Sequence, residues 1–103
     1  MKGMSLNIYV YEIEKHHTIL LYEWLLECAQ KLGIERGLAL RSIAGYDKSN
    51  PMHEAHFFEL GSNLPIELIF VSDRTKIDVF LEKLKQEKIS VFYTLSEVDY
   101  GST

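Results

Sequence analysis

Hydrophobic and polar residues recur along this chain with two different periods, which predict strands and helices in turn. Between Leu6 and Ile13 the side chains alternate between two faces, as they do in a strand. One face of this strand would carry Leu6, Ile8 and Val10, and the other Tyr9, Tyr11 and Ile13. A hydrophobic stripe with the helical period follows, and it predicts a helix from Thr18, as N-cap, to Leu32. Gly33 then fits the left-handed position that ends a helix.

The rest of the chain continues this pattern of strands and helices. The predicted elements are a strand at about 38–46, a turn at 47–51, an extended segment at 53–60, a strand at 66–71, a helix at about 72–87 and a strand from about 90 towards 98. Pro65 would begin the strand at 66–71, because a missing N–H group costs least at the first residue of a strand.

The order of these elements, β-α-β-β-α-β, is the split βαβ arrangement. Right-handed crossovers would place both helices on one face of an antiparallel sheet. We therefore expect an α+β fold of the ferredoxin-like sandwich type. The length of 103 residues allows one hydrophobic core, so we expect residues 1–103 to form a single domain.

The second face of the predicted sheet has no helix to cover it. A sheet open to water should alternate hydrophobic and polar residues, yet the strands at 6–13 and 66–71 are hydrophobic on both sides. Soluble monomers rarely expose such a surface. A closed homo-oligomer that packs sheet against sheet would bury it. Coverage by edge loops or by a C-terminal segment is the alternative.

Composition and charge exclude several classes of protein. The chain is 47% hydrophobic and 25% charged, as globular proteins are, and its net charge of −4 argues against nucleic-acid binding. No hydrophobic run is long enough to span a bilayer, and no signal peptide is recognisable at the start. The single cysteine, Cys28, suits a reducing compartment. We therefore expect a cytoplasmic protein.

Several segments together carry a family resemblance. They are the run Asn7–Glu12 (NIYVYE), Leu21-Tyr22-Glu23, Gly37–Tyr46 (GLALRSIAGY), His53 with His56, and Asn63–Ile69 (NLPIELI). In this order and spacing they resemble the uncharacterised PII-like family named domain of unknown function 190, over about residues 6 to 99.

The resemblance implies a ferredoxin-like fold and a homotrimer, as in PII signalling proteins. It also implies a small anionic ligand, with an adenine nucleotide as the candidate, in the cleft between subunits. The loop at residues 45–63 would change shape when this ligand binds and would dock onto a transporter or an enzyme. The implied function is therefore a signalling or regulatory one.

Eight residues are candidates for the ligand site. They are Arg41, Gly45, Tyr46, Lys48, His53, His56, Arg74 and Lys76. Arg41 would be neutralised at a subunit boundary by the ligand or by a structural ion pair. Gly45 suits a hinge and Tyr46 a stacking surface. Arg74 and Lys76 could assist the N-terminus of the second helix in binding a phosphate.

The four histidines suggest a second hypothesis, a trimer that binds divalent metal ions in the manner of copper-tolerance proteins. On a strand, His53 and His56 would point to opposite faces, so partly exposed polar side chains are the simpler interpretation of this pair. His16 and His17 fall in a predicted turn, where adjacent side chains should diverge into solvent.

A third hypothesis is a small ferredoxin-like enzyme with a pocket near Trp24. No Ser-His-Asp order, paired-carboxylate site or glycine-rich dinucleotide fingerprint is visible in the sequence. Cys28 lies in the hydrophobic stripe of the first helix without a neighbouring base, which favours a buried small hydrophobe over a nucleophile. We therefore predict a protein that is not an enzyme.

Overall fold

The centre of the molecule is a four-stranded antiparallel sheet. The computed structural model describes residues 1–48, 50–54 and 63–103, and for 50–54 it describes the backbone alone. The strands of the sheet are β1 (Lys2–Tyr11), β4 (Arg36–Arg41), β7 (Pro65–Ser72) and β8 (Phe92–Asp99). Their order is β4-β7-β1-β8, and every neighbouring pair is antiparallel.

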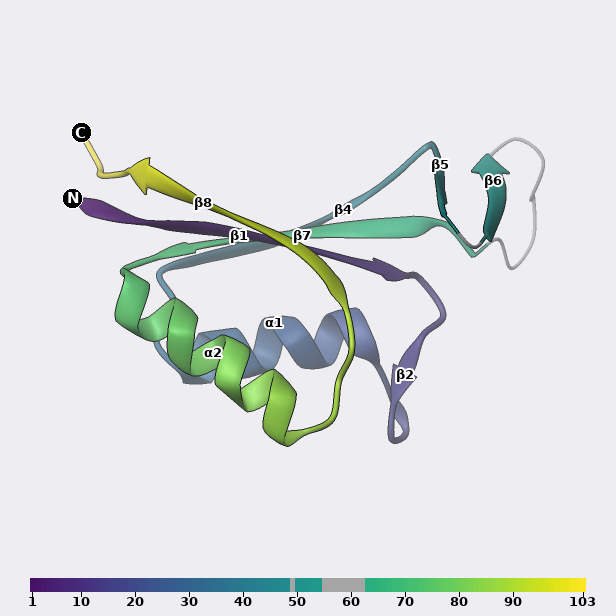
Figure 1. Ribbon diagram of the computed structural model, residues 1–103, viewed down its shortest axis with the longest axis horizontal. Coiled ribbons are helices and arrows are strands. Elements are labelled where there is room, and N and C mark those ends of the chain that lie inside the picture. The colour runs from purple at the N-terminus through teal and green to yellow at the C-terminus, as the bar shows by residue number, and fades with distance from the viewer. Residues whose placement is uncertain (49, 55–62) are drawn as a thin grey trace.

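Two helices cover one face of this sheet (Figure 1). They are α1 (Leu21–Lys31) and α2 (Arg74–Gln86). The element order and the strand order together give the α+β, ferredoxin-like arrangement that the sequence predicts. The opposite face of the sheet, which we call the open face, carries no helix (Figure 1).

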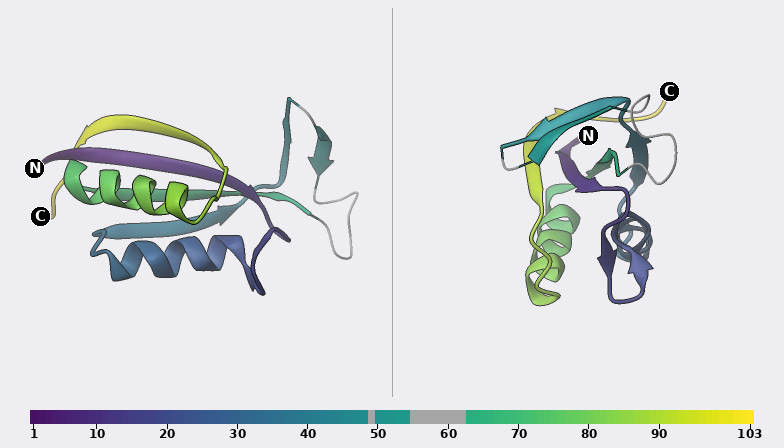
Figure 2. Two further views of the ribbon diagram at one scale, coloured as in Figure 1. Left: turned by 60° about the horizontal axis from the view of Figure 1, so that its bottom comes forward. Right: turned by 90° about the vertical axis from the view of Figure 1, so that its right-hand side faces the viewer.

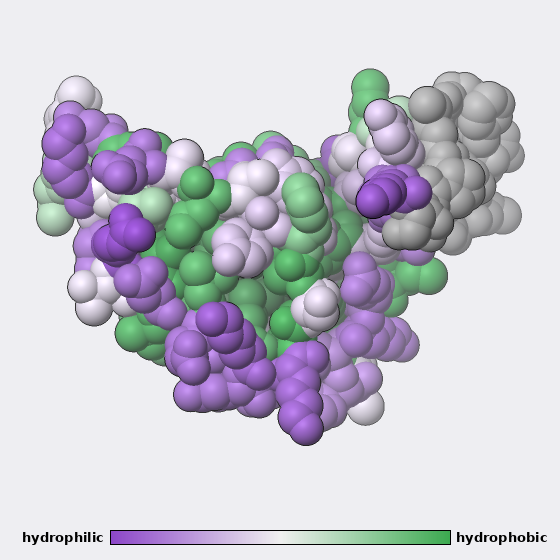
Figure 3. Space-filling view, viewed as in Figure 1, coloured by the Kyte–Doolittle hydropathy of each residue, from purple (hydrophilic) through white to green (hydrophobic). Residues whose placement is uncertain are grey.

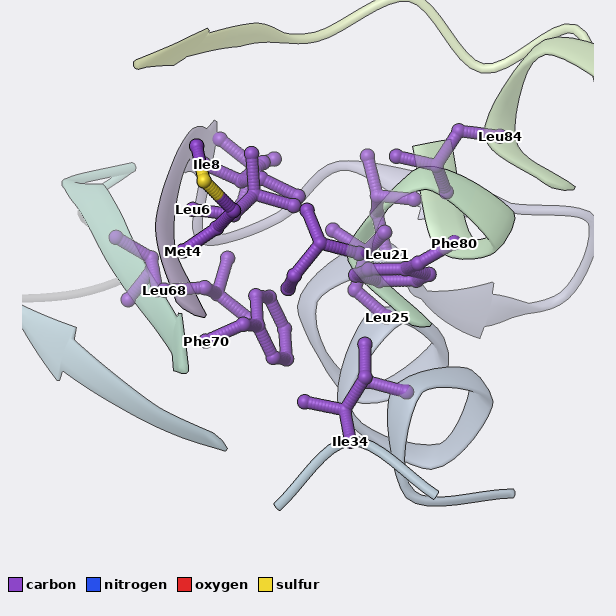
Figure 4. Packing of buried hydrophobic residues seen from close by; sticks show 14 residues of the cluster. Met4, Leu6, Ile8, Leu21, Leu25, Ile34, Leu68, Phe70, Phe80 and Leu84 are labelled. Carbon is purple, nitrogen blue, oxygen red and sulfur yellow. The ribbon is translucent and has the colours of Figure 1, made fainter. Parts of the chain in front are cut away.

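The hydrophobic core lies between the sheet and the helices (Figure 4). The sheet contributes alternate residues from its two central strands, namely Met4, Leu6, Ile8 and Val10 from β1 and Ile66, Leu68 and Phe70 from β7. The helices contribute Leu21, Leu25 and Ala29 from α1 and Ile77, Phe80 and Leu84 from α2. Phe70 and Phe80 meet edge to face with ring centroids 5.0 Å apart. The predicted alternation of β1 and the hydrophobic stripes of both helices are therefore confirmed.

The first helix begins later than the sequence predicts. A short hairpin of β2 (Lys15–His16) and β3 (Ile19–Leu20) occupies the chain before it, and the N-cap residue is Leu20. The prediction of Thr18 as N-cap is therefore wrong. The end of the helix is as predicted, because Gly33 has a φ of +82° and its N–H donates to the carbonyl of Gln30.

The predicted strand at 38–46 is divided into two. After β4, the backbone N–H and the hydroxyl of Ser42 both donate to the carbonyl of Pro65, and the chain then leaves the sheet. It continues into a second hairpin, formed by β5 (Ala44–Asp47) and β6 (Asn50–Glu54). This hairpin projects at the end of the sheet that lies away from the two termini (Figures 1 and 2). Among the described residues, no helix is long and hydrophobic enough to span a bilayer.

Candidate functional site

A cleft of about 910 Å³, open to solvent in a single chain, lies between the open face of the sheet and the first strand of the hairpin β5–β6. Its walls are rich in aromatic side chains. The lining includes Tyr9, Tyr11, Tyr46 and Phe92, together with Gly45, Lys48, Pro65 and Glu67. The space-filling view is hollowed between the hairpin and the termini, above the sheet (Figure 3). Such a mixture of aromatic surface with a few polar groups is typical of small-molecule sites.

Two short hydrogen bonds and a close approach of the backbone place the hairpin against the sheet. The Tyr11 hydroxyl donates to Oδ2 of Asp47 at 2.7 Å, and the Ser42 hydroxyl donates to the carbonyl of Pro65 at 2.7 Å. A Cβ atom at Gly45 would lie 3.0 Å from Cγ of Pro65. Glycine at position 45 therefore allows the hairpin to approach β7 closely. The hinge role of Gly45 that the sequence suggests stays a prediction.

A polar network forms the floor of the cleft. Oε2 of Glu67 accepts hydrogen bonds from the Tyr9 hydroxyl at 2.8 Å and from Nδ2 of Asn7 at 3.2 Å. The Ser5 hydroxyl donates to Oδ1 of Asn7 at 3.1 Å. The hydrogen bond to Glu67, followed by burial, raises the pKa of Tyr9 above its ordinary value. The open face is thus less uniformly hydrophobic than the alternation of the strands predicts.

Hydrophobic side chains flank this network. One row of paired residues crosses all four strands of the open face, in the order Leu40, Glu67, Tyr9 and Phe92. Leu40 is 49% exposed and Phe92 is 71% exposed. The ring of Phe92 lies 5.8 Å from that of Tyr9. The two edges of the face therefore expose hydrophobic groups on either side of a polar centre.

The cleft brings together three of the predicted ligand residues, namely Gly45, Tyr46 and Lys48. Arg41 is placed differently. It pairs in register with the buried Ile66, on the face that the helices cover, and its Nε lies 3.1 Å from Oε2 of Glu12. The structure thus contains an ion pair of Arg41, which was one of the two interpretations of this residue, and it places Arg41 on the face that the helices cover.

Arg74 and Lys76 lie at the other end of the sheet. They follow the last residue of β7, whereas the cleft lies beside Pro65, the first residue of that strand. Seven residue steps of about 3.3 Å separate the two ends by about 23 Å. Nη1 of Arg74 donates to Sδ of Met4, and Nζ of Lys76 lies 3.7 Å from Oδ1 of Asp73. Within one subunit these two cations therefore do not join the cleft.

The predicted pair of His53 and His56 falls largely outside the described residues. The backbone of His53 pairs with Gly45 in the hairpin β5–β6, but the side chain of His53 and the whole of His56 are not described. Metal binding by this pair therefore stays a prediction.

The other histidines contradict the expectation that adjacent rings diverge. The rings of His16 and His17 lie with their centroids 4.2 Å apart, and Nε2 of His16 lies 3.0 Å from Oε1 of Glu87. His17 has a φ of +59°, which breaks the alternation of side chains that an extended backbone would impose. Cys28 is half-buried against the core, and burial raises the pKa of its thiol, as expected for an unreactive cysteine.

Sequence reasoning missed Glu67 and Phe92 as members of the site. Alternation places Tyr9 on the second face of its strand, but it cannot show which residues lie beside it. That information comes from the strand order and the register, which pair Tyr9 with Glu67 on one side and with Phe92 on the other. Only a predicted register of β1 with its two neighbouring strands could have shown that Glu67 and Phe92 lie beside Tyr9.

Comparison with known sequences gives a consistent result. A family model, DUF190, described as "Uncharacterized ACR", matches residues 3–100. A UPF0166 protein of Aquifex aeolicus (strain VF5) is 33% identical over 99 residues, which amount to 96% of this chain and 93% of that protein.

Comparison with solved structures concerns the fold. CPII, a nitrogen regulatory PII-like protein from Thiomonas intermedia K12, bound to ADP, AMP and bicarbonate, matches with a TM-score of 0.73 at 15% identity, over 99% of this chain and 91% of that one. CutA1 from Oryza sativa matches with a TM-score of 0.57 at 12% identity, over 98% of this chain and 85% of that one. The fold of this chain is therefore PII-like.

Proposed function

The chain belongs to the DUF190 family, and from this premise we propose that it is a PII-like regulatory protein without catalytic activity. In this proposal it is a cytoplasmic homotrimer of single-domain subunits. It binds a small anionic ligand, with an adenine nucleotide as the candidate, where the cleft of one subunit meets its neighbour. The observation that carries the proposal is the aromatic cleft between the open face and the hairpin β5–β6.

The chemistry of the cleft suits the parts of a nucleotide. Tyr46 and Phe92 are 72% and 71% exposed as residues, and their rings offer surfaces on which a base can stack. Lys48 brings the cation that a phosphate needs. The carboxylate of Glu67 is an acceptor at the floor, so it favours an amino group of the base and repels the phosphates. The base would therefore lie deep and the phosphates near Lys48.

The open face supports association of subunits. Leu38 and Leu40 at one edge and Phe92 at the other are exposed to between 39% and 71% in a single chain. Packing these edges against other copies would remove hydrophobic surface from water and would enclose the cleft. A ligand held between subunits would then contact the hairpin of one chain and the sheet of another.

The hairpin β5–β6 is the proposed signalling element. It projects from the sheet and contributes Gly45, Tyr46 and Lys48 to the cleft, so ligand binding and the position of the hairpin are coupled (Figure 2). The chain from residue 45 to residue 63 would present a different surface to a transporter or an enzyme when the ligand is bound.

Isothermal titration calorimetry with ATP, ADP and AMP tests this function. We expect at least one of the three to bind, and Tyr46→Ala to weaken that binding by about tenfold through loss of stacking. Val79→Ala is the matched control, because Val79 is an exposed residue on α2, away from the cleft. Absence of heat from all three nucleotides at millimolar concentration would discard the nucleotide as ligand.

A further inference from the structure

A second group of side chains with ligand chemistry lies on the other side of the sheet. His16, His17 and Glu87 each offer one donor atom, and the three atoms lie within 4.8 Å of one another. We call these three residues the histidine–glutamate cluster. Two of them come from the hairpin β2–β3 and its turn, and the third follows α2, so the cluster joins segments that are 70 residues apart in the chain.

The backbone at the turn is held in an uncommon conformation that brings both rings together. His17 has a φ of +59°, a left-handed conformation that is uncommon outside glycine, although histidine, asparagine and aspartate adopt it more often than other residues do. His16 is fixed on its other side by Trp24, whose ring meets it edge-on at 4.9 Å. The His16 side chain is only 12% exposed. The two-residue turn between β2 and β3 itself calls for a positive φ, so the observation that a solvated turn does not explain is the burial of His16.

The third member is placed where a cation is favourable. Glu87 is the C-cap residue of α2, and the carbonyl groups at the end of a helix already give that end a partial negative charge. The carboxylate of Glu87 makes the electrostatic potential at this end of the helix more negative. Lys83 partly compensates for it, with Nζ 3.4 Å from Oε2 of Glu87.

We propose that the histidine–glutamate cluster binds a divalent transition-metal ion of the zinc or copper type. Two imidazoles and one carboxylate suit these ions better than magnesium or calcium, which prefer oxygen ligands. Three protein ligands leave the fourth position of a tetrahedral ion to water. Ligand atoms around such an ion lie about 3.3 Å apart, and Nε2 of His16 is already 3.0 Å from Oε1 of Glu87. Rotation of the exposed His17 ring would bring the third ligand atom to a similar distance.

This site is independent of the proposed nucleotide cleft. None of its three residues lines that cleft, and none of them belongs to the His53 and His56 pair of the sequence analysis. Lys83 would compete with the metal ion, because the ammonium group of Lys83 and the metal ion would both bind the carboxylate of Glu87.

The single tryptophan of the chain provides a direct test. Copper(II) bound at His16 would lie close to Trp24 and would quench its fluorescence, so untagged protein is titrated with copper(II) and competition with zinc is then measured. We expect saturable quenching that zinc reverses. His17→Asn, which removes a ligand but tolerates the left-handed backbone, and Glu87→Gln should each weaken binding by about tenfold or more.

Two further variants decide between this site and its alternatives. The double variant His53→Ala/His56→Ala should quench as the wild type does, and Lys83→Ala should bind the metal more tightly because the carboxylate of Glu87 is released. Circular dichroism verifies that each variant is folded, and the exposed His17 keeps the test available if Glu87→Gln unfolds. Quenching that is absent, that survives His17→Asn, or that disappears in the double variant would overturn the proposal.

Discussion

The Tyr9 hydroxyl donates a hydrogen bond of 2.8 Å to the carboxylate of Glu67, directly across the pairing of β1 and β7. Both side chains lie on the open face, and they form the floor of the cleft beneath the hairpin β5–β6. The pair therefore sets the polarity of the proposed ligand site: an acceptor below and aromatic rings around it.

Replacement of Glu67 by glutamine should lower the pKa of Tyr9 towards that of an ordinary tyrosine. The hydrogen bond to Glu67 is the first cause of the raised pKa of Tyr9, burial is the second and the charge of Glu67 is the third. Glutamine keeps the shape of the side chain, but it removes the charge and is a weaker hydrogen-bond acceptor. Titration of tyrosine absorbance measures the change, and the Tyr9→Phe variant identifies which of the six tyrosines is responsible. An unchanged titration in Glu67→Gln would show that the pair does not control this pKa.

The same pair predicts a dependence of stability on alkaline pH. A pKa raised in the folded state gives stability that is fully present below the unfolded pKa of about 10 and is lost as the pH rises through the folded value. The wild type should therefore lose more stability above pH about 10 than Glu67→Gln does. Urea unfolding at several pH values measures this difference, and equal losses would contradict it.

Lys48 and Lys76 should differ in their effect on nucleotide binding. Lys48 lines the cleft, whereas Lys76 lies at the far end of the sheet beside Asp73. Loss of a charge-assisted contact costs about 1.5–3 kcal/mol, so Lys48→Ala should weaken binding by about tenfold or more. Lys76→Ala is the matched control and should bind as the wild type does. Calorimetry that shows the reverse order would place the phosphates elsewhere.

Gly45 should be sensitive to any side chain. A Cβ atom there would lie 3.0 Å from Cγ of Pro65, so the branched side chain of Gly45→Val should crowd Pro65 and shift the hairpin away from β7. We expect weaker nucleotide binding with little loss of thermal stability, because no core residue is touched. Gly101→Val is the control, since no atom lies within 4 Å of a Cβ at that position. Equal binding by both variants would contradict the role of the close approach.

Much of the fold could be predicted from local sequence signals. The alternation in β1, the stripes in both helices, Gly33 after α1 and Pro65 at the start of β7 each depend on a residue and its near neighbours. Thr18 failed as an N-cap because residues 15–20 pair with each other in a hairpin, and the N–H of Leu21 donates to the carbonyl of Glu14 instead. A favourable N-cap residue alone does not show whether the residues after it begin a helix or pair in a hairpin.

The candidate site was harder to predict, because it depends on register. Tyr46 was expected as a stacking surface and Lys48 was among the candidate ligand residues, but Glu67 joins them only because it pairs with Tyr9 across two strands. Arg74 and Lys76 were expected to assist the N-terminus of the second helix in binding a phosphate, and the length of β7 separates them from the cleft within one subunit. The proximity of His16, His17 and Glu87 likewise arises from tertiary structure, because the residue that ends α2 meets the hairpin β2–β3.

Leu40 and Val79 provide a matched test of the open face. Both are exposed aliphatic residues, at 49% and 48%, but Leu40 lies on the open face and Val79 on α2. A buried charge without a partner is costly, so Leu40→Glu should dissociate the oligomer while Val79→Glu leaves it intact. Size-exclusion chromatography measures the difference, and circular dichroism verifies that both variants are folded. Identical elution of the two variants would contradict an interface on the open face.

The most direct test of the account is the mass of the untagged protein at micromolar concentration, measured by sedimentation equilibrium. If copies of the chain cover one another's open faces as a trimer, the mass is three times 12.0 kDa, about 36 kDa. A stable particle of 12.0 kDa would contradict this, because the cleft would then face solvent in a single chain and no ligand could lie between subunits.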